Sequence, residues 1–134
     1  MEQNAEWTTD ELGIEKTFCC IQSNARDFAK LGSLLLNGGK FENVPLIDEK
    51  FISQMITPTQ NSNGVYGMGV WTNYDSKIHH YYLRGLYGQY VIVVPEYDMI
   101  IVRFGNKEGE QKDLKNRPAE VEFYIDEALK LTQK

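Results

Sequence analysis

The chain of 134 residues is long enough for one domain with its own core and too short for two ordinary domains. Apolar residues make up 42% and charged residues 25%, a balance typical of a soluble globular protein. The net charge of −5, without a long basic run, argues against a nucleic-acid partner, and no apolar run is long enough to span a membrane.

The first predicted helix follows an irregular N-terminal segment. Residues 1–22 show no clean hydrophobic period, so we expect an irregular lead-in there. Ser23 or Asn24 can cap a helix that begins directly afterwards, and the pair Gly38-Gly39 can end it in a left-handed turn. The apolar face of this predicted helix consists of Phe28, Leu31, Leu34 and Leu35.

A second, shorter helix is predicted just downstream. Asp48 can cap this helix, and Pro58 ends it because proline cannot continue a helix. Its apolar stripe consists of Phe51, Ile52, Met55 and Ile56. The polar stretch 57–64 is expected to be a loop, so the lead-in and the two helices make up a first predicted segment, residues 1–64.

The second predicted segment, residues 65–134, begins with strands. Four stretches rich in β-branched and aromatic residues are separated by short turns, at 66–73, 79–85, 89–95 and 98–105. Connections this short join antiparallel neighbours, so the sequence predicts an antiparallel β-meander. Residues 91–94 and 99–102 are apolar at every position, which is typical of strands that are covered on both faces.

A C-terminal helix is predicted to cover one face of this sheet. Pro118 suits a first helical position. Apolar residues then recur at helical spacing at Val121, Tyr124, Ile125, Ala128 and Leu129. We expect the opposite face to be covered by the helices of residues 24–56 or by something outside the chain. The predicted fold class is therefore α+β, one compact unit in which helices flank an antiparallel meander.

The cysteines and histidines do not suggest a metal or catalytic cluster. Cys19 and Cys20 are sequence neighbours, and because a disulfide between neighbours is strained and rare, we expect two reduced, partly buried thiols. His79 and His80 lie on a predicted strand, where alternation directs them to opposite faces. The sequence holds no phosphate-binding loop, dinucleotide fingerprint or zinc-protease motif, so we expect neither a metal nor a cofactor.

The stretch "RGLYGQYVIVVPEYDMIIVRFGN", residues 84–106, places a glycine-bracketed turn before two apolar strands. Taken alone, Gly85 and Gly88 indicate a β-turn or a close approach of a backbone or ligand. Preceded by "FCCIQSNARDFAKLGSLLLNGGKFENVPLIDEKFISQMITP" and "YGMGVW", the stretch resembles the C-terminal part of the β-lactamase-related serine hydrolases. That family includes class C β-lactamases, penicillin-binding D-alanyl-D-alanine peptidases and esterases. The resemblance runs from about residue 18 to the end of the chain.

The resemblance implies that the chain lacks the nucleophile and base of that family. Members use S-x-x-K with the nucleophilic serine, Y-x-N or S-x-N with a proton-transfer residue, and K-T-G on a sheet strand. None of the five serines has a lysine three residues on, and no tyrosine or serine has an asparagine two residues on. Because the first two motifs are absent, we expect the chain alone to be inactive.

The resemblance also implies a substrate-binding rim. By position, Leu86-Tyr87-Gly88 stands in place of K-T-G, with only the glycine kept. Gln89 would then contribute its backbone N–H to an oxyanion hole, a role that needs no particular side chain. Asn106 follows the last predicted strand, where relatives often carry a polar residue near the carboxylate of the substrate. Leu86, Tyr87, Gly88 and Asn106 are therefore the implied substrate-binding residues.

Three interpretations stay open. The preferred one is the C-terminal portion of a β-lactamase-family serine hydrolase, with part of the helical subdomain in residues 1–64, acting on an amide, ester, peptide or β-lactam. The alternative is a non-catalytic binding or structural domain derived from that family, marked by a last strand covered by residues 1–22. The third is an unrelated α+β domain that matches by chance.

The resemblance also bears on partners and compartment. In the family, strands from the N-terminal end pair beside the last strand of the sheet, so residues 98–105 would otherwise present an open edge. We therefore expect this edge to pair with a second copy or with a separate chain that carries the missing N-terminal half. Relatives are often periplasmic or exported, but the polar start "MEQNAEWTTDELG" shows no secretory signal and leaves the compartment undecided.

Overall fold

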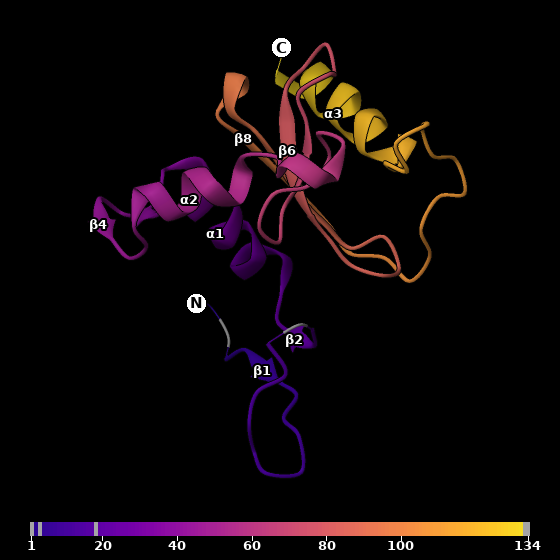
Figure 1. Ribbon diagram of the computed structural model, residues 1–134. Coiled ribbons are helices and arrows are strands. Elements are labelled where there is room, and N and C mark those ends of the chain that lie inside the picture. The colour runs from indigo at the N-terminus through magenta and orange to yellow at the C-terminus, as the bar shows by residue number, and fades with distance from the viewer. Residues whose placement is uncertain (1, 3, 18, 133–134) are drawn as a thin grey trace.

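The computed structural model describes residues 2, 4–17 and 19–132. A four-stranded sheet lies between two helices from the N-terminal half of the chain and one C-terminal helix (Figure 1). The elements are β1 (Glu6–Trp7), β2 (Ile21–Gln22), α1 (Ala25–Leu36), β3 (Lys40–Phe41), β4 (Val44–Pro45), α2 (Glu49–Ile56), η1 (Gln60–Ser62), β5 (Trp71–Asn73), β6 (His80–Arg84), β7 (Tyr90–Val94), η2 (Pro95–Tyr97), β8 (Met99–Arg103) and α3 (Ala119–Thr132).

The residues before α1 include a two-stranded ribbon, in which β1 pairs antiparallel with β2. The indole Nε1 of Trp7 donates to the carbonyl oxygens of Lys16 at 3.0 Å and Cys19 at 2.9 Å. Cys19 and Cys20 are joined by a disulfide, so the prediction of two reduced thiols is wrong. Cys20 has a left-handed φ of 75°, and its carbonyl accepts from the Thr8 backbone N–H at 3.1 Å. This tight turn, held against the ribbon, keeps the two sulfurs side by side.

The two helices of the N-terminal half begin at the predicted caps. Asn24 Oδ1 accepts the backbone N–H of Asp27 at 2.9 Å, which satisfies a free donor in the first turn of α1. Asp48 Oδ1 does the same for α2, accepting the Lys50 N–H at 2.8 Å and that of Phe51 at 3.2 Å. After α1 the chain turns through Gly38 and Gly39, both with positive φ, as predicted.

The sheet is the predicted antiparallel meander, with strand order β5-β6-β7-β8. Its register places Tyr82 of β6 opposite Ile92 of β7, and Ile92 opposite Ile101 of β8. The first strand is shorter than the predicted stretch 66–73, because Gly69 has a φ of 81° and interrupts it before Trp71.

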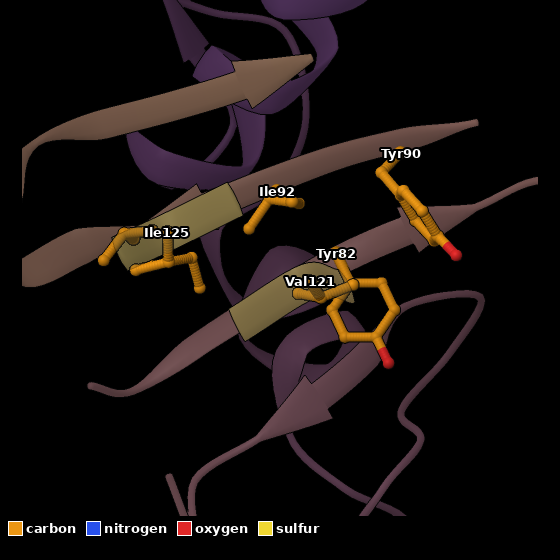
Figure 2. Packing of buried hydrophobic residues seen from close by; sticks show 6 residues of the cluster. Tyr82, Tyr90, Ile92, Val121 and Ile125 are labelled. Carbon is orange, nitrogen blue, oxygen red and sulfur yellow. The ribbon is translucent and has the colours of Figure 1, made fainter. Parts of the chain in front are cut away.

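Side chains from the two faces of the sheet enter separate cores. On one face α3 packs Val121 and Ile125 against Tyr82, Tyr90, Ile92 and Val94 (Figure 2). On the other face Tyr81 and Val93 join Leu35 of α1, Ile52 of α2 and Val70. The expectation that both faces of the apolar strands are covered is therefore confirmed.

Strand β8 forms an edge of the sheet. All five residues of β7 are buried, whereas all five residues of β8 are only partly buried. The reason is that β8 pairs with β7 alone, and within the described residues no second strand pairs with it. The ribbon strand β1 pairs with β2 and leaves this edge open.

Candidate functional site

The turn formed by residues 85–89 connects β6 to β7 and contains most of the predicted site. The Gly85 N–H donates to the Gln89 carbonyl at 2.8 Å, and the Gly88 N–H donates to the Gly85 carbonyl at 3.4 Å. Gly88 has a φ of 77°, which gives a three-residue hairpin loop with a left-handed glycine at its end. Leu86, Tyr87 and Gly88 thus lie in the turn itself, between two strands.

The turn exposes two side chains and buries its glycine. Leu86 is 80% exposed and Tyr87 is 56% exposed, whereas Gly88 is buried. A Cβ atom at Gly88 would collide with the guanidinium of Arg103 and would lie 3.0 Å from the carbonyl oxygen of Lys107. Glycine is required here both for the positive φ and for this close approach.

Arg103, at the end of β8, fastens the turn to the chain segment that follows the strand. Its Nη1 donates to the Gly88 carbonyl and, at 3.1 Å, to the Lys107 carbonyl, which also accepts from Nη2 at 3.1 Å. The guanidinium also lies 5.8 Å from the ring centroid of Tyr124 in α3. A planar group with several donors can bind two carbonyls at once, which a lysine cannot do with the same geometry.

The side chain of Gln89 braces the same turn. Its Oε1 accepts the Tyr87 N–H at 3.0 Å, and its Nε2 donates to the Gly105 carbonyl at 2.7 Å. Within the described part of the chain, the backbone N–H groups of Leu86 and Gln89 have no hydrogen-bond acceptor. The bracing bonds therefore use carbonyl oxygens of this region as acceptors. The backbone N–H groups of Leu86 and Gln89 are the two donors of the turn that keep no acceptor in the described residues.

The structure brings the predicted site residues together at one end of the sheet. Asn106 is exposed and lies between Gly105 and Lys107, whose carbonyls bind Gln89 and Arg103 respectively. Arg103 was missed by the reasoning from sequence. The signal for it was a single charged residue in the otherwise apolar run 99–104.

A second polar cluster, also missed from the sequence, lies on the α3 side of β7. The Tyr90 hydroxyl lies 2.7 Å from Glu120 Oε1 and 3.2 Å from Glu108 Oε1, and Arg84 Nε donates to the same Glu108 oxygen at 2.7 Å. Burial and the neighbouring Glu120 carboxylate raise the pKa of Tyr90, so its hydroxyl stays protonated. This cluster ties the segment after β8 to α3 and offers no free base.

The described residues contain no assembled nucleophile. The hydroxyl of Ser23 donates toward a carboxylate oxygen of Asp27 at 3.4 Å, that of Ser62 to the Thr59 carbonyl at 2.8 Å, and that of Ser76 to Glu122 at 3.1 Å. Across residues 2, 4–17 and 19–132, no serine hydroxyl is hydrogen-bonded to a histidine or lysine nitrogen. In the same residues no group of acidic, histidine or cysteine side chains is arranged to hold a metal, and no helix could cross a bilayer.

Comparison with known proteins gives one coarse assignment. No protein-family model and no curated protein matches the sequence. Among solved structures, the chain is similar to one described as "Putative 6-aminohexanoate-dimer hydrolase from Bacillus anthracis", with a TM-score of 0.78 and 25% sequence identity. The similarity covers 99% of this chain and 35% of that chain, so this chain spans about a third of the length of that protein.

The fold and this similarity define a class of protein. The chain has an α+β fold of the β-lactamase-like hydrolase type, with an antiparallel meander between helices, which confirms the fold class expected from the sequence. The similarity supports a relationship to the serine hydrolase superfamily.

Proposed function

We propose that this chain is the C-terminal portion of a β-lactamase-family serine hydrolase. In this proposal the nucleophilic serine and its base are not among the 134 residues of this chain. The observation that carries the proposal is the structural similarity, which covers nearly all of this chain but only 35% of the hydrolase it matches. In the assembled protein, a serine would attack the carbonyl carbon of an amide, ester, peptide or β-lactam, and water would then hydrolyse the acyl-serine.

In this proposal the turn at residues 85–89 supplies the rim of the acyl-transfer pocket. The carbonyl oxygen of the substrate becomes negatively charged in the tetrahedral intermediate, and backbone N–H groups stabilise it if they are fixed in place beforehand. The Gln89 N–H is the proposed donor, because the turn is braced by its side chain and by Arg103. Exposed Leu86, Tyr87 and Asn106 would contact the substrate around it.

We further propose that the β8 edge pairs with a strand of the missing half or with a second copy of this chain. The non-catalytic alternative predicted that residues 1–22 would cover this edge, but β1 pairs with β2 instead. Light scattering over a range of concentrations tests the second-copy arm. A mass that rises with concentration supports self-association, whereas a monomer at every concentration leaves the missing half as the partner.

The test of the function is active-site labelling. The purified chain is incubated with a fluorophosphonate and with a fluorescent penicillin, and its intact mass is then measured. We expect no adduct, because among the described residues no serine hydroxyl is hydrogen-bonded to a histidine or lysine nitrogen. A stoichiometric adduct on one of the five serines would show that the chain has a nucleophile of its own and would refute the proposal.

A second experiment tests the role of the turn. The segment encoded upstream is searched for S-x-x-K, and the protein that contains both parts is labelled in the same way. Gly88→Ala should slow labelling strongly, because a Cβ there collides with Arg103. Tyr97→Phe, in the exposed η2 turn at the opposite end of β7, is the control and should leave labelling unchanged.

A further inference from the structure

The β1–β2 ribbon, which comprises residues 6–17 and 19–22, lies apart from both hydrophobic cores. Figure 1 shows it beyond the N-terminal end of α1, away from the four-stranded sheet. Neither core includes a described residue of the ribbon. Both residues of β1 are exposed, and of the two residues of β2 one is partly buried and one is exposed. Hydrogen bonds and the Cys19–Cys20 disulfide, rather than buried apolar area, therefore hold the ribbon together.

The carbonyl groups of both cysteines accept hydrogen bonds from the opposite side of the ribbon. The indole Nε1 of Trp7 donates to the Cys19 carbonyl at 2.9 Å. The backbone N–H and the hydroxyl of Thr8 donate to the Cys20 carbonyl at 3.1 Å and 3.4 Å respectively. The Cys19 N–H in turn donates to the Lys16 carbonyl at 3.0 Å. The main-chain conformation of the cysteine pair therefore decides whether the ribbon keeps these bonds.

Cys20 has a backbone conformation that a free cysteine disfavours. Its φ of 75° lies in the left-handed region, which a residue with a Cβ atom populates less than the right-handed region by a factor of about 5–30. The disulfide closes a ring that includes the peptide bond between Cys19 and Cys20. This ring restricts the φ of Cys20. Once the ring is open, Cys20 is free to return to negative φ, which turns its carbonyl away from Thr8.

The disulfide is also accessible and of the kind that is readily reduced. Cys20 is exposed and Cys19 is partly exposed. Ordinary disulfides join residues whose Cα atoms are about 4.4–6.8 Å apart, whereas the neighbours Cys19 and Cys20 have Cα atoms 3.7 Å apart. Strained or exposed disulfides are the labile ones, because a thiolate can reach a sulfur and the products relieve the ring.

We propose that the Cys19–Cys20 disulfide is a thiol–disulfide exchange site that accepts electrons from a dithiol, and that its reduction releases the β1–β2 ribbon. A thiolate of the dithiol attacks one sulfur, which breaks the S–S bond and forms a mixed disulfide, and the second thiol of the reductant then displaces that sulfur. Two electrons and two protons thus pass to the cysteine pair, which becomes two thiols, while the dithiol becomes a disulfide. The proposal is independent of the hydrolase function, because it uses no residue of the turn or of the β8 edge.

The exchange is tested on the folded chain with dithiothreitol as the dithiol. The chain is treated with iodoacetamide in native buffer, with and without prior dithiothreitol, and its intact mass is measured. We expect no alkylation without the reductant and two alkyl groups after it, one on each cysteine. Alkylation of the untreated chain would show that the thiols are free, and alkylation that requires urea would show that the disulfide is closed to the reductant. Either result would overturn the proposal.

The release of the ribbon is tested by NMR on the isotope-labelled chain. Reduction should accelerate the exchange of the Thr8 amide hydrogen with water by about fivefold or more, because its acceptor turns away. The Trp7 Nε1–H signal should shift, and reoxidation should restore both. Amides of β7, which is buried in the sheet, are the internal control and should exchange at the same rate in both states. Unchanged exchange at Thr8 in a fully reduced chain, or faster exchange throughout β7, would refute a local release.

A matched pair of variants separates the conformation of residue 20 from the loss of the bond. Cys19→Ser with Cys20→Ser and Cys19→Ser with Cys20→Gly both lack the disulfide, but glycine takes a positive φ without a steric cost. The chain with Cys20→Ser should exchange at Thr8 as fast as the reduced chain. The chain with Cys20→Gly should exchange several-fold more slowly than its partner. Equal rates in the two variants would show that the left-handed φ of Cys20 does not couple the disulfide to the ribbon.

Discussion

Replacing Gly32 by alanine tests how α1 packs on the sheet. Gly32 lies inside α1, where alanine is about 1 kcal/mol more favourable than glycine for an exposed position. Here a Cβ atom would lie 2.7 Å from Ile100 Cγ2 and 2.9 Å from Val91 Cγ1. Both methyl groups are attached directly to Cβ and cannot swing away without a rotamer change. Overpacking of this kind costs about 1–3 kcal/mol, so the net expectation is a loss of about 1 kcal/mol of unfolding free energy.

Urea unfolding followed by far-UV circular dichroism measures this change. Ser33→Ala, one residue along α1, is the control and should stay within about 0.5 kcal/mol of the parent, because it adds no atom and removes only an exposed hydrogen bond from Asn37 Nδ2. In an Ile100→Ala background the principal clash is gone, so the cost of Gly32→Ala should fall by about 1 kcal/mol as a pairwise coupling. A Gly32→Ala chain that is more stable by the full propensity gain would refute the close contact between α1 and β8.

Three further changes address the core, a cap and pH. Tyr81→Phe should cost about 1 kcal/mol of unfolding free energy, because it removes the buried hydrogen bond to the last turn of α1, and an unchanged urea midpoint would contradict that bond. Asp48→Ala should also cost about 1 kcal/mol by uncapping α2, and circular dichroism should show less helix; an unchanged helix signal and urea midpoint would contradict the cap. Burial opposes ionisation of Glu108, but Lys112 and Arg84 outweigh it and lower its pKa. Its contribution to stability is therefore present above the unfolded pKa and is lost as the pH falls through the lower folded pKa. Glu108→Gln should flatten the acid side of the stability–pH profile, and the same slope in both chains would count against the pairing.

The elements of the fold could be predicted because their signals are local. A capping oxygen at Asn24 or Asp48 acts on backbone N–H groups only two or three residues away, so sequence neighbours decide it. The meander follows from short turns, which force neighbouring strands to be antiparallel. The need for a layer on each face follows from the unbroken apolar run of β7, which the structure buries completely.

The parts that could not be predicted depend on contacts between distant residues. Arg103 is separated from Gly88 by most of β7 and β8, and only the pairing of these strands brings the guanidinium to the turn. The disulfide of Cys19 and Cys20 depends on a left-handed residue in a ribbon that the irregular hydrophobic pattern did not reveal. The predicted strand at 66–73 was too long because residue type alone does not tell which glycine takes a positive φ.

The way in which the turn is braced bears directly on what it can do. Arg103 and the side chain of Gln89 bind carbonyl oxygens of the turn and of the segment after β8, while the N–H groups of Leu86 and Gln89 keep no acceptor in the described residues. Main-chain donors that are fixed before a substrate arrives require no reorganisation when negative charge develops on an oxygen. Arg103 also terminates β8, the open edge of the sheet. A strand that pairs with this edge would therefore add support to Arg103, which links the proposed missing half to the proposed oxyanion donor.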